Sequence, residues 1–247
     1  MKNYKPIFSL AAIQDPQKKL RSKFGGRPWG LDPSIWPKRM ALLAQLVHDP
    51  PMIDLGGDNV LHIWHWNTPE DYRDPPNYEY FCHFSTLIPK SKLTNELTPA
   101  PVGQKLIGEV YVESWEEFDD NAPQEWLPMF YDPKSYSNLL ERETGAIHFG
   151  GGLGTKFGGP PCWRGTNAIY DSPKHCDFIF QTDAYIRIPG QAPSDDIVKQ
   201  HKLEGIIPAP NGDGYIYVIT DFACDGSAFV FLDKSQSPPL PLWSWSR

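Results

Sequence analysis

The sequence predicts an α+β fold, a duplicated and mainly antiparallel β-unit with few helices, whose two imperfect repeats pack on a shared core. The tetrapeptide Lys-Phe-Gly-Gly occupies residues 23–26 and returns at 156–159, each time with Trp a few residues later. Each copy leads to an apolar run with a single Gln, at 41–47 and at 177–182. A Gly-Asp turn and an apolar strand follow in the same order, which indicates an internal duplication.

The first unit begins with the glycine turn and continues into a predicted hairpin. Glycine adopts positive φ without a steric penalty, and Asp-Asn or Asp-Gly ahead of β-branched and aromatic residues favours a hairpin. The resulting strand covers 56–64 and alternates in polarity. Alternation places Leu61 and Ile63 on one face of the strand. His62 and Trp64 then share the opposite face.

The second unit is predicted to repeat this order of elements. Its turn and strand cover 211–219, matching 56–64 of the first unit. An aromatic strand closes each unit, at 80–84 and at 228–232. Neither small sheet can bury its apolar face alone, so we expect the two units to pack on one another.

Residues 98–150 lie between the units and differ from both. A strand is predicted at 106–112, followed by an acidic segment at 115–120. The best helix candidate covers 134–143. Its expected boundary residues are Asp132 as N-cap, Pro133 at the first helical position and Gly145 as the stop.

Two further segments are predicted outside the strands. Residues 189–208 form a surface loop with a short helical piece around 197–202. The tail at 237–245 is rich in proline and ends in tryptophan rings. Such a tail either docks on the body of the protein or presents a ligand to a groove, and docking is the favoured interpretation.

The expected organisation is one globular domain over residues 1–247. It consists of repeats at about 22–88 and 155–233 and a middle insertion at about 98–150. The 20 glycines and 26 prolines make the chain rich in loops without reaching the proportion that indicates disorder. The four cysteines are widely spaced, so we interpret them as ordinary thiols.

The composition also restricts partners and location. The formal charge of −7 gives no basic face for nucleic acid, so no nucleic-acid partner is expected. No apolar run approaches the length of a membrane span, so no membrane partner is expected. Residues 1–20 lack the charge and hydropathy pattern of a secretion signal, which predicts a cytoplasmic protein.

Several of these motifs resemble the YwqG-like family, a bacterial group catalogued mainly as a domain of unknown function. The resemblance rests on Lys-Phe-Gly-Gly-x-Pro-Trp at 23–29, the apolar run around Gln45, and Asn-Gly-Asp-Gly at 211–214 with its strand. It implies an α+β fold on a duplicated β-unit and an association with immunity proteins, and it supplies no catalytic residues. The sequence departs from the family pattern at Asn59, where Gly would complete the first Gly-Asp-Gly, and at Pro160, where the first copy has Arg27.

No catalytic, cofactor or metal site is predicted. His62 and His65 are three residues apart on a strand, which places them on opposite faces and prevents them from sharing a metal. The glycine-rich segment at 150–159 lacks the Gly-Lys-Ser/Thr of a phosphate-binding loop. The two prolines at 160–161 prevent the helix that a dinucleotide-binding loop requires.

The leading hypothesis is a non-catalytic cytoplasmic binding protein, and the specific role it suggests is that of an immunity protein that neutralises a basic bacterial toxin domain. Rings among carboxylates suit such a partner, because rings supply contact area and carboxylates steer basic surfaces. The predicted anchors are Trp64, Trp66 and Tyr78. The predicted steering charges are Asp71, Asp74, Glu116, Glu117 and Asp119.

Three alternatives remain open. In the first, the rings around Trp64 fill a core between sheets instead of facing a partner. In the second, the protein is an enzyme or small-ligand-binding protein with a site between the two repeats, near Lys156, Asp213 and His175. In the third, it is a purely structural or scaffolding module.

Overall fold

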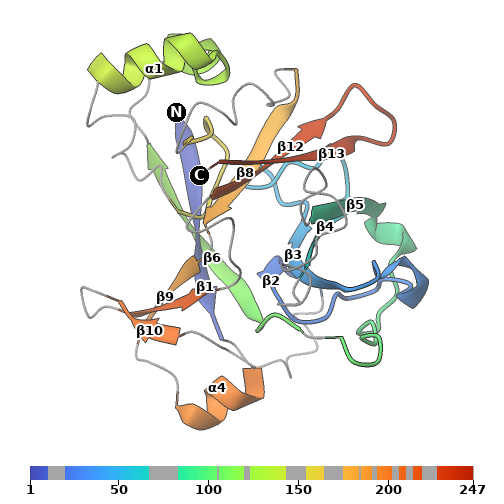
Figure 1. Cartoon of the computed structure of the whole chain (residues 1–247). Coiled ribbons are helices and arrows are strands. Elements are labelled where there is room, and N and C mark those ends of the chain that lie inside the picture. The colour runs from blue at the N-terminus through green and yellow to red at the C-terminus, as the bar shows by residue number, and fades with distance from the viewer. Residues whose placement is uncertain are drawn as a thin grey trace.

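A large antiparallel sheet curves until its two outermost strands, β5 and β13, lie against each other (Figure 1). The structure is a computed structural model. It describes residues 1–10, 20–66, 83–104, 106–119, 123–142, 154–163, 175–183, 185–190, 194–201, 206–209, 214–218 and 227–246. The strand order in the large sheet is β13-β12-β8-β7-β1-β6-β2-β3-β4-β5. The bounds are β1 (Lys2–Ser9), β2 (Lys23–Phe24), β3 (Met40–Val47), β4 (Asn59–Trp66), β5 (His83–Pro89), β6 (Val110–Asp119), β7 (Lys156–Phe157), β8 (Asp177–Asp183), β12 (Ser227–Asp233) and β13 (Leu240–Ser246).

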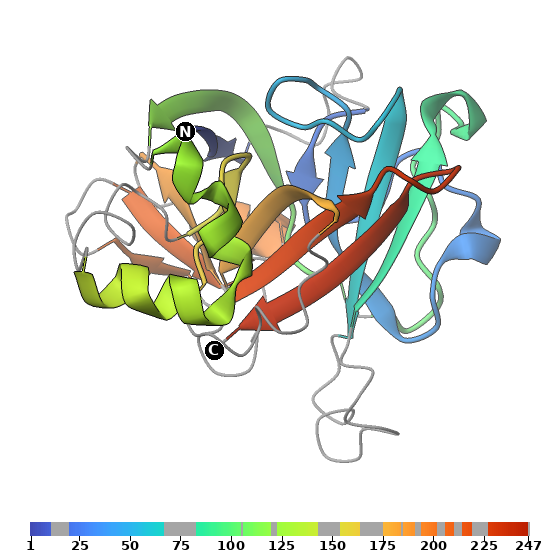
Figure 2. The same cartoon turned by 90° about the horizontal axis from the view of Figure 1, so that it is seen from above.

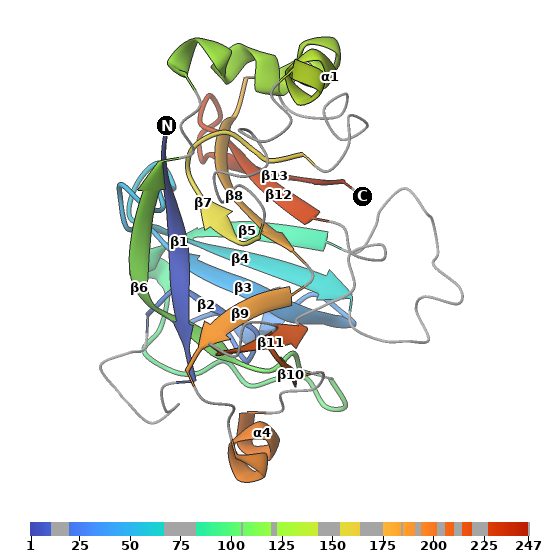
Figure 3. The same cartoon turned by 90° about the vertical axis from the view of Figure 1, so that its left-hand side faces the viewer.

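Strands β1 and β6 pair at the centre of this sheet (Figure 3). We call β2–β6 the N-terminal half and β1 with β7–β13 the C-terminal half. The strand predicted at 106–112 is therefore displaced, because pairing with β1 extends β6 through the acidic segment to Asp119. Carboxylates on the exposed face of a paired strand do not interrupt its hydrogen bonds. The acidic residues at 115–119 therefore belong to the strand, although their charge did not predict one.

One apolar cluster joins the two halves. It contains Phe24 and Leu43 from the N-terminal half and Phe157 and Phe180 from the C-terminal half, among others. The Phe24 and Phe180 rings meet edge to face, with their centroids 6.4 Å apart. The shared core that the sequence predicts is therefore present on the concave side of the sheet.

A second sheet, of three strands, adds to this core. It comprises β9 (Tyr185–Pro189), β10 (Ile206–Pro208) and β11 (Gly214–Val218), in the order β10-β11-β9. Alternate residues of β9 and β11, including Ile186 and Tyr217, face the shared core. This arrangement corrects the predicted match of the 211–219 strand with the 56–64 strand. Strand β12 pairs with β8 as β4 pairs with β3, whereas β11 belongs to the smaller sheet.

Helical segments cover parts of the outer face. A 3-10 segment η4 (Gln124–Tyr131) runs into α1 (Pro133–Arg142), and both lie over the outer side of β8 and β12 (Figure 2). Asp132 caps α1 by accepting a hydrogen bond from the Ser135 amide at 2.8 Å, which confirms the predicted helix start. The predicted stop, Gly145, lies outside the described residues.

The remaining helical segments are short. Helix α4 (Asp195–His201) confirms the helical piece predicted in the 189–208 loop and lies at the end of the molecule opposite α1 (Figures 1 and 3). The 3-10 turns η2 (Pro33–Ile35) and η3 (Lys90–Lys92) lie in connections of the N-terminal half. In the part of the chain that the structure describes, no helix has the length and apolar character needed to cross a bilayer.

The proline-rich tail docks on the body, as favoured from the sequence. It forms β13, which pairs with β12 along its whole length, from Leu240 opposite Asp233 to Ser246 opposite Ser227. Trp243 of this strand packs against the shared core. The tail therefore completes the large sheet at its outer edge.

Candidate functional site: a carboxylate-lined cleft

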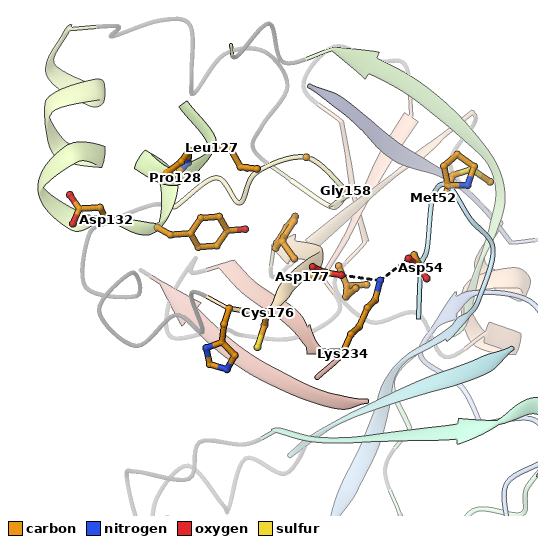
Figure 4. A pocket seen from close by; sticks show the side chains of 15 residues that line it. Met52, Asp54, Leu127, Pro128, Asp132, Gly158, Cys176, Asp177 and Lys234 are labelled. Atoms are coloured by element: carbon orange, nitrogen blue, oxygen red, sulfur yellow. Dashed lines mark hydrogen bonds and ion pairs between the residues drawn. The ribbon is translucent and has the colours of Figure 1, made fainter. Parts of the chain in front are cut away.

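A cleft of about 780 Å³ lies between the two halves, beneath η4 (Figure 4). The 48–58 connection of the N-terminal half forms one wall, and the start of β8 with the turn after β12 forms another. The lining residues are Pro51, Met52, Asp54, Leu127, Pro128, Tyr131, Asp132, Gly158, Gly159, His175, Cys176, Asp177, Phe178, Ile179 and Lys234.

An ion-pair triad spans the cleft from one half to the other. The Lys234 Nζ lies 2.6 Å from an Asp54 carboxylate oxygen and 2.9 Å from one of Asp177 (Figure 4). Partial burial acts to lower the pKa of Lys234, but the hydrogen bonds and charges of the two carboxylates outweigh it and raise that pKa. The Lys234 hydrogen bond also lowers the pKa of Asp54, helped by the Gly56 amide. The cleft therefore already holds one ammonium group between two carboxylates.

The side chains that line the cleft are negatively charged overall. The lining contains three carboxylates, Asp54, Asp132 and Asp177, and one ammonium, that of Lys234, so with His175 neutral its formal charge is −2. Asp54 and Asp177 keep more than half of their side-chain surface exposed beside Lys234. A cationic ligand matches this surface better than an anionic one.

Apolar side chains complete the wall under η4. Tyr131 lies against Phe231 of β12, with ring centroids 6.4 Å apart, and Leu127 and Pro128 flank it. Burial, followed by the charge of Asp177, raises the pKa of Tyr131, so its hydroxyl stays protonated and can donate a hydrogen bond at neutral pH. The cleft thus combines carboxylates with an apolar patch, as sites for amphipathic ligands do.

Buried polar contacts hold the glycine turn that lines the cleft. Lys156, 1% exposed, donates from Nζ to the Asn3 Oδ1 at 2.9 Å and to the Pro160 carbonyl at 2.6 Å. Gln181, opposite Lys156 in the sheet, accepts from the Cys162 amide at 2.8 Å. These bonds fix the turn between β7 and β8.

The N-terminal half contains a turn with matching contacts, except that its lysine bonds a carboxylate in place of an amide oxygen. Lys23 donates to the Arg27 carbonyl and to the Glu109 carboxylate, both within the protein interior. Gln45, opposite Lys23 in the sheet, accepts from the Trp29 amide at 2.8 Å. In both turns the two glycines have φ between 62° and 70°. The single Gln in each apolar run therefore has a structural role, since it binds the segment after the glycine turn. The sequence alone showed only that a Gln recurs in both runs.

Trp64 is not an exposed anchor, contrary to the leading hypothesis. Its side chain is 0% exposed, and it packs against Trp36 with ring centroids 5.1 Å apart on the outer face of β4. The segment around η2 covers that face, so the alternative in which these rings fill a core holds for Trp64. His62 stacks on Trp64 from the same face, as the alternation predicted.

Among the other predicted partner-binding residues, those that the structure describes are not brought together with Trp64. Tyr78, Asp71 and Asp74 lie outside the described residues, as does the side chain of Trp66 on β4. The described carboxylates are exposed on β6, where Glu117 pairs with Lys2 at 2.8 Å and Asp119 with the N-terminus at 2.7 Å. The third, Glu116, borders a smaller groove beside β9.

Of the three residues named for the alternative site between the repeats, one is placed at the cleft. His175 lines the cleft, whereas Lys156 is buried behind the turn at 158–159, and Asp213 lies outside the described residues. Sequence reasoning missed Asp54, Asp177 and Lys234, because each is a single charged residue in a different part of the chain: a connection, a strand start and a turn. They can be recognised as a site only in the folded structure, where they form an ion-pair triad.

No family model matches this chain and no curated protein matches its sequence. The resemblance to the YwqG-like family therefore stays a prediction.

Proposed function

We propose that this chain is a non-catalytic binding protein whose cleft accepts a positively charged, partly apolar segment of a partner protein. The observation that carries the proposal is the cleft lining, which combines a formal charge of −2 with an apolar wall. A basic partner was already expected from the sequence. The proposal moves its main contact from the ring-rich segment near Trp64 to the cleft.

The triad suggests how such a segment is held. Asp54 and Asp177 already surround an ammonium group, and the exposed sides of both carboxylates are free to accept hydrogen bonds from an entering Lys or Arg side chain. An apolar side chain of the segment then packs on Tyr131 and Leu127. Charge steers the encounter, and apolar contact supplies retention.

The biological role we propose is the one favoured by the sequence, neutralisation of a basic toxin domain by occluding its surface in the cytoplasm. The exposed carboxylates of β6 add acidic surface outside the cleft, although Glu117 already pairs with Lys2 of β1 and Asp119 with the N-terminal amino group. Exposed charges that are already paired contribute little to affinity. The cleft is therefore the expected centre of the interface.

We also propose that the two halves descend from a duplicated unit. The matched Lys–Gln pairings, the paired glycine conformations and the order of strands around β2–β5 and β7–β8–β12–β13 support this. The unit so defined differs from the predicted repeats in that β12 and β13 take the places of β4 and β5. Strands β9–β11 are then an insertion of the C-terminal half.

Peptide binding tests the proposed site. The probe is a fluorescein-labelled decapeptide of alternating Arg and Leu, with a decapeptide of alternating Glu and Leu as its charge-reversed control. Fluorescence anisotropy is expected to show saturable binding of the basic peptide that weakens as salt increases. The double variant Asp54→Asn, Asp177→Asn is expected to weaken this binding about tenfold, because it removes both carboxylates that face the ligand.

A matched variant separates the cleft from net charge. Asp195→Asn with Asp196→Asn removes the same number of charges from exposed positions on α4, which lies at the end of the molecule opposite α1 (Figure 1). This variant is expected to bind the basic peptide as the wild type does. Equal weakening in both double variants would show a diffuse charge effect and would contradict the proposal.

A further inference from the structure

Three side chains with different donor atoms converge at the rim of the cleft. A ring nitrogen of His175, the Cys176 Sγ and a carboxylate oxygen of Asp233 all lie within 4.8 Å of one another. The register explains the meeting, because Leu232 of β12 lies opposite Asp177 of β8. Asp233, the residue after Leu232, therefore lies opposite Cys176, the residue before Asp177.

We propose that His175, Cys176 and Asp233 bind a divalent transition-metal ion, with zinc the best match. An imidazole, a thiolate and a carboxylate form a donor set that suits zinc, whereas calcium and magnesium prefer oxygen donors alone. The sequence predicted no metal site, since Asp233 is more than fifty positions away from the adjacent His175 and Cys176. His175 is 72% exposed, so a metal ion can reach the site from solvent on the side of this residue.

The carboxylate is already oriented for this role. One Asp233 oxygen accepts hydrogen bonds from the Ser235 amide at 2.9 Å and the Ser235 hydroxyl at 2.6 Å. The other oxygen lies 3.8 Å from the His175 Nε2. That separation approaches the roughly 3.3 Å between ligand atoms of a tetrahedral zinc site with bonds near 2.0 Å. Rotation of the exposed His175 side chain can shorten the distance between these two atoms to that value.

The charge of the site also favours a cation. The Ser235 hydrogen bonds lower the pKa of Asp233, so it is ionised at neutral pH. Burial, followed by the charges of Asp233 and Asp177, raises the pKa of the Cys176 thiol. A bound divalent ion offsets the negative charges of Asp233 and Asp177 that surround this thiol.

Cobalt titration tests the site with the metal alone, so its outcome does not depend on the peptide-binding proposal. Under a non-thiol reductant, one equivalent of Co²⁺ is expected to produce the near-ultraviolet charge-transfer absorption of a cobalt–thiolate bond. Competition with Zn²⁺ is expected to remove it. The variant Cys176→Ser is expected to abolish the band, and His175→Ala and Asp233→Asn to weaken affinity at least about tenfold.

Two matched controls keep the test decisive. Cys162→Ser alters the other described buried thiol, and Asp195→Asn alters an exposed carboxylate on α4, so both are expected to keep the band and the affinity. His175→Ala removes an exposed side chain, and circular dichroism checks that each variant is folded. A band that persists in Cys176→Ser, or affinity unchanged in His175→Ala, would assign the metal elsewhere and overturn the proposal. Absence of any thiolate band would overturn it too.

Discussion

His62 is fully buried on β4, and neither ring nitrogen has a hydrogen-bond partner among the described residues. A charged imidazole would be poorly solvated there. Burial, followed by the nearby charge of Lys23, lowers the pKa of His62 to about 3. The ring is therefore neutral in the folded protein at every pH at which the protein is expected to work, and it becomes charged only on unfolding at mildly acidic pH.

This depressed pKa predicts a loss of stability on acidification. Since the unfolded chain binds a proton near pH 6.5 and the folded chain does not, the free energy of unfolding falls as pH drops below 6.5 and levels off near pH 3. Between pH 8 and pH 5 the contribution of His62 is about 2 kcal/mol. Urea unfolding at the two pH values measures it.

A pair of variants isolates the residue responsible. His62→Leu is expected to reduce the difference between pH 8 and pH 5 by about 2 kcal/mol. His175→Ala removes an exposed histidine and is expected to retain the difference. If both variants keep the wild-type difference, the account of His62 is wrong.

At the scale of elements, the glycine turns and strand alternation could be predicted from the sequence. Leu61 and Ile63 face the shared core, as alternation along that strand requires. The fate of the opposite face could not be predicted, because alternation does not reveal whether another segment covers it. Trp64 is buried by the segment around Trp36, which follows the first glycine turn.

The first glycine turn, at 25–26, gives a testable prediction about the stability of a single element. Gly26 has φ +70°, and a Cβ there would lie 2.5 Å from the Glu109 carboxylate that pairs with Lys23. Gly103 has a similar φ of +77° but no atom within 4 Å of such a Cβ. Gly103→Ala is expected to cost about 1–2 kcal/mol from backbone strain. Gly26→Ala is expected to cost at least about 1 kcal/mol more, because it disturbs a buried hydrogen-bonded charge.

Thermal or urea unfolding of the two alanine variants provides the comparison. Their shared left-handed backbone makes Gly103→Ala the control for strain alone. Equal losses of stability would mean that the Lys23–Glu109 pair moves without cost, contrary to the structural role assigned to this turn.

At the scale of the whole molecule, strand pairing was the least predictable feature. The sequence predicts a two-part sheet with a shared core, but it matched the strand at 211–219 to β4. In the structure, β12 takes the position beside β8 that β4 takes beside β3, and the strand at 211–219 does not. Local patterns define strands without defining neighbours, because neighbours depend on contacts between residues far apart in the sequence.

The cleft shows the same limit. Its central residues, Asp54, Asp177 and Lys234, come from a connection, a strand start and a turn, and no local motif joins them. His175 was named as a candidate from the sequence because histidine is chemically versatile, and it lies at this cleft. Its companions, Cys176 and Asp233, become candidates only once β8 and β12 are paired.

Mapping the bound basic peptide onto the protein tests the central claim most directly. The measurement is the change in backbone amide NMR shifts of ¹⁵N-labelled protein on adding the Arg-Leu decapeptide. The account predicts that the largest changes cluster at 51–54, 127–132, 175–179 and Lys234, which line the cleft. Changes concentrated instead on β6 at 116–119 and around Lys2 would contradict it and would place the partner on the exposed acidic strand.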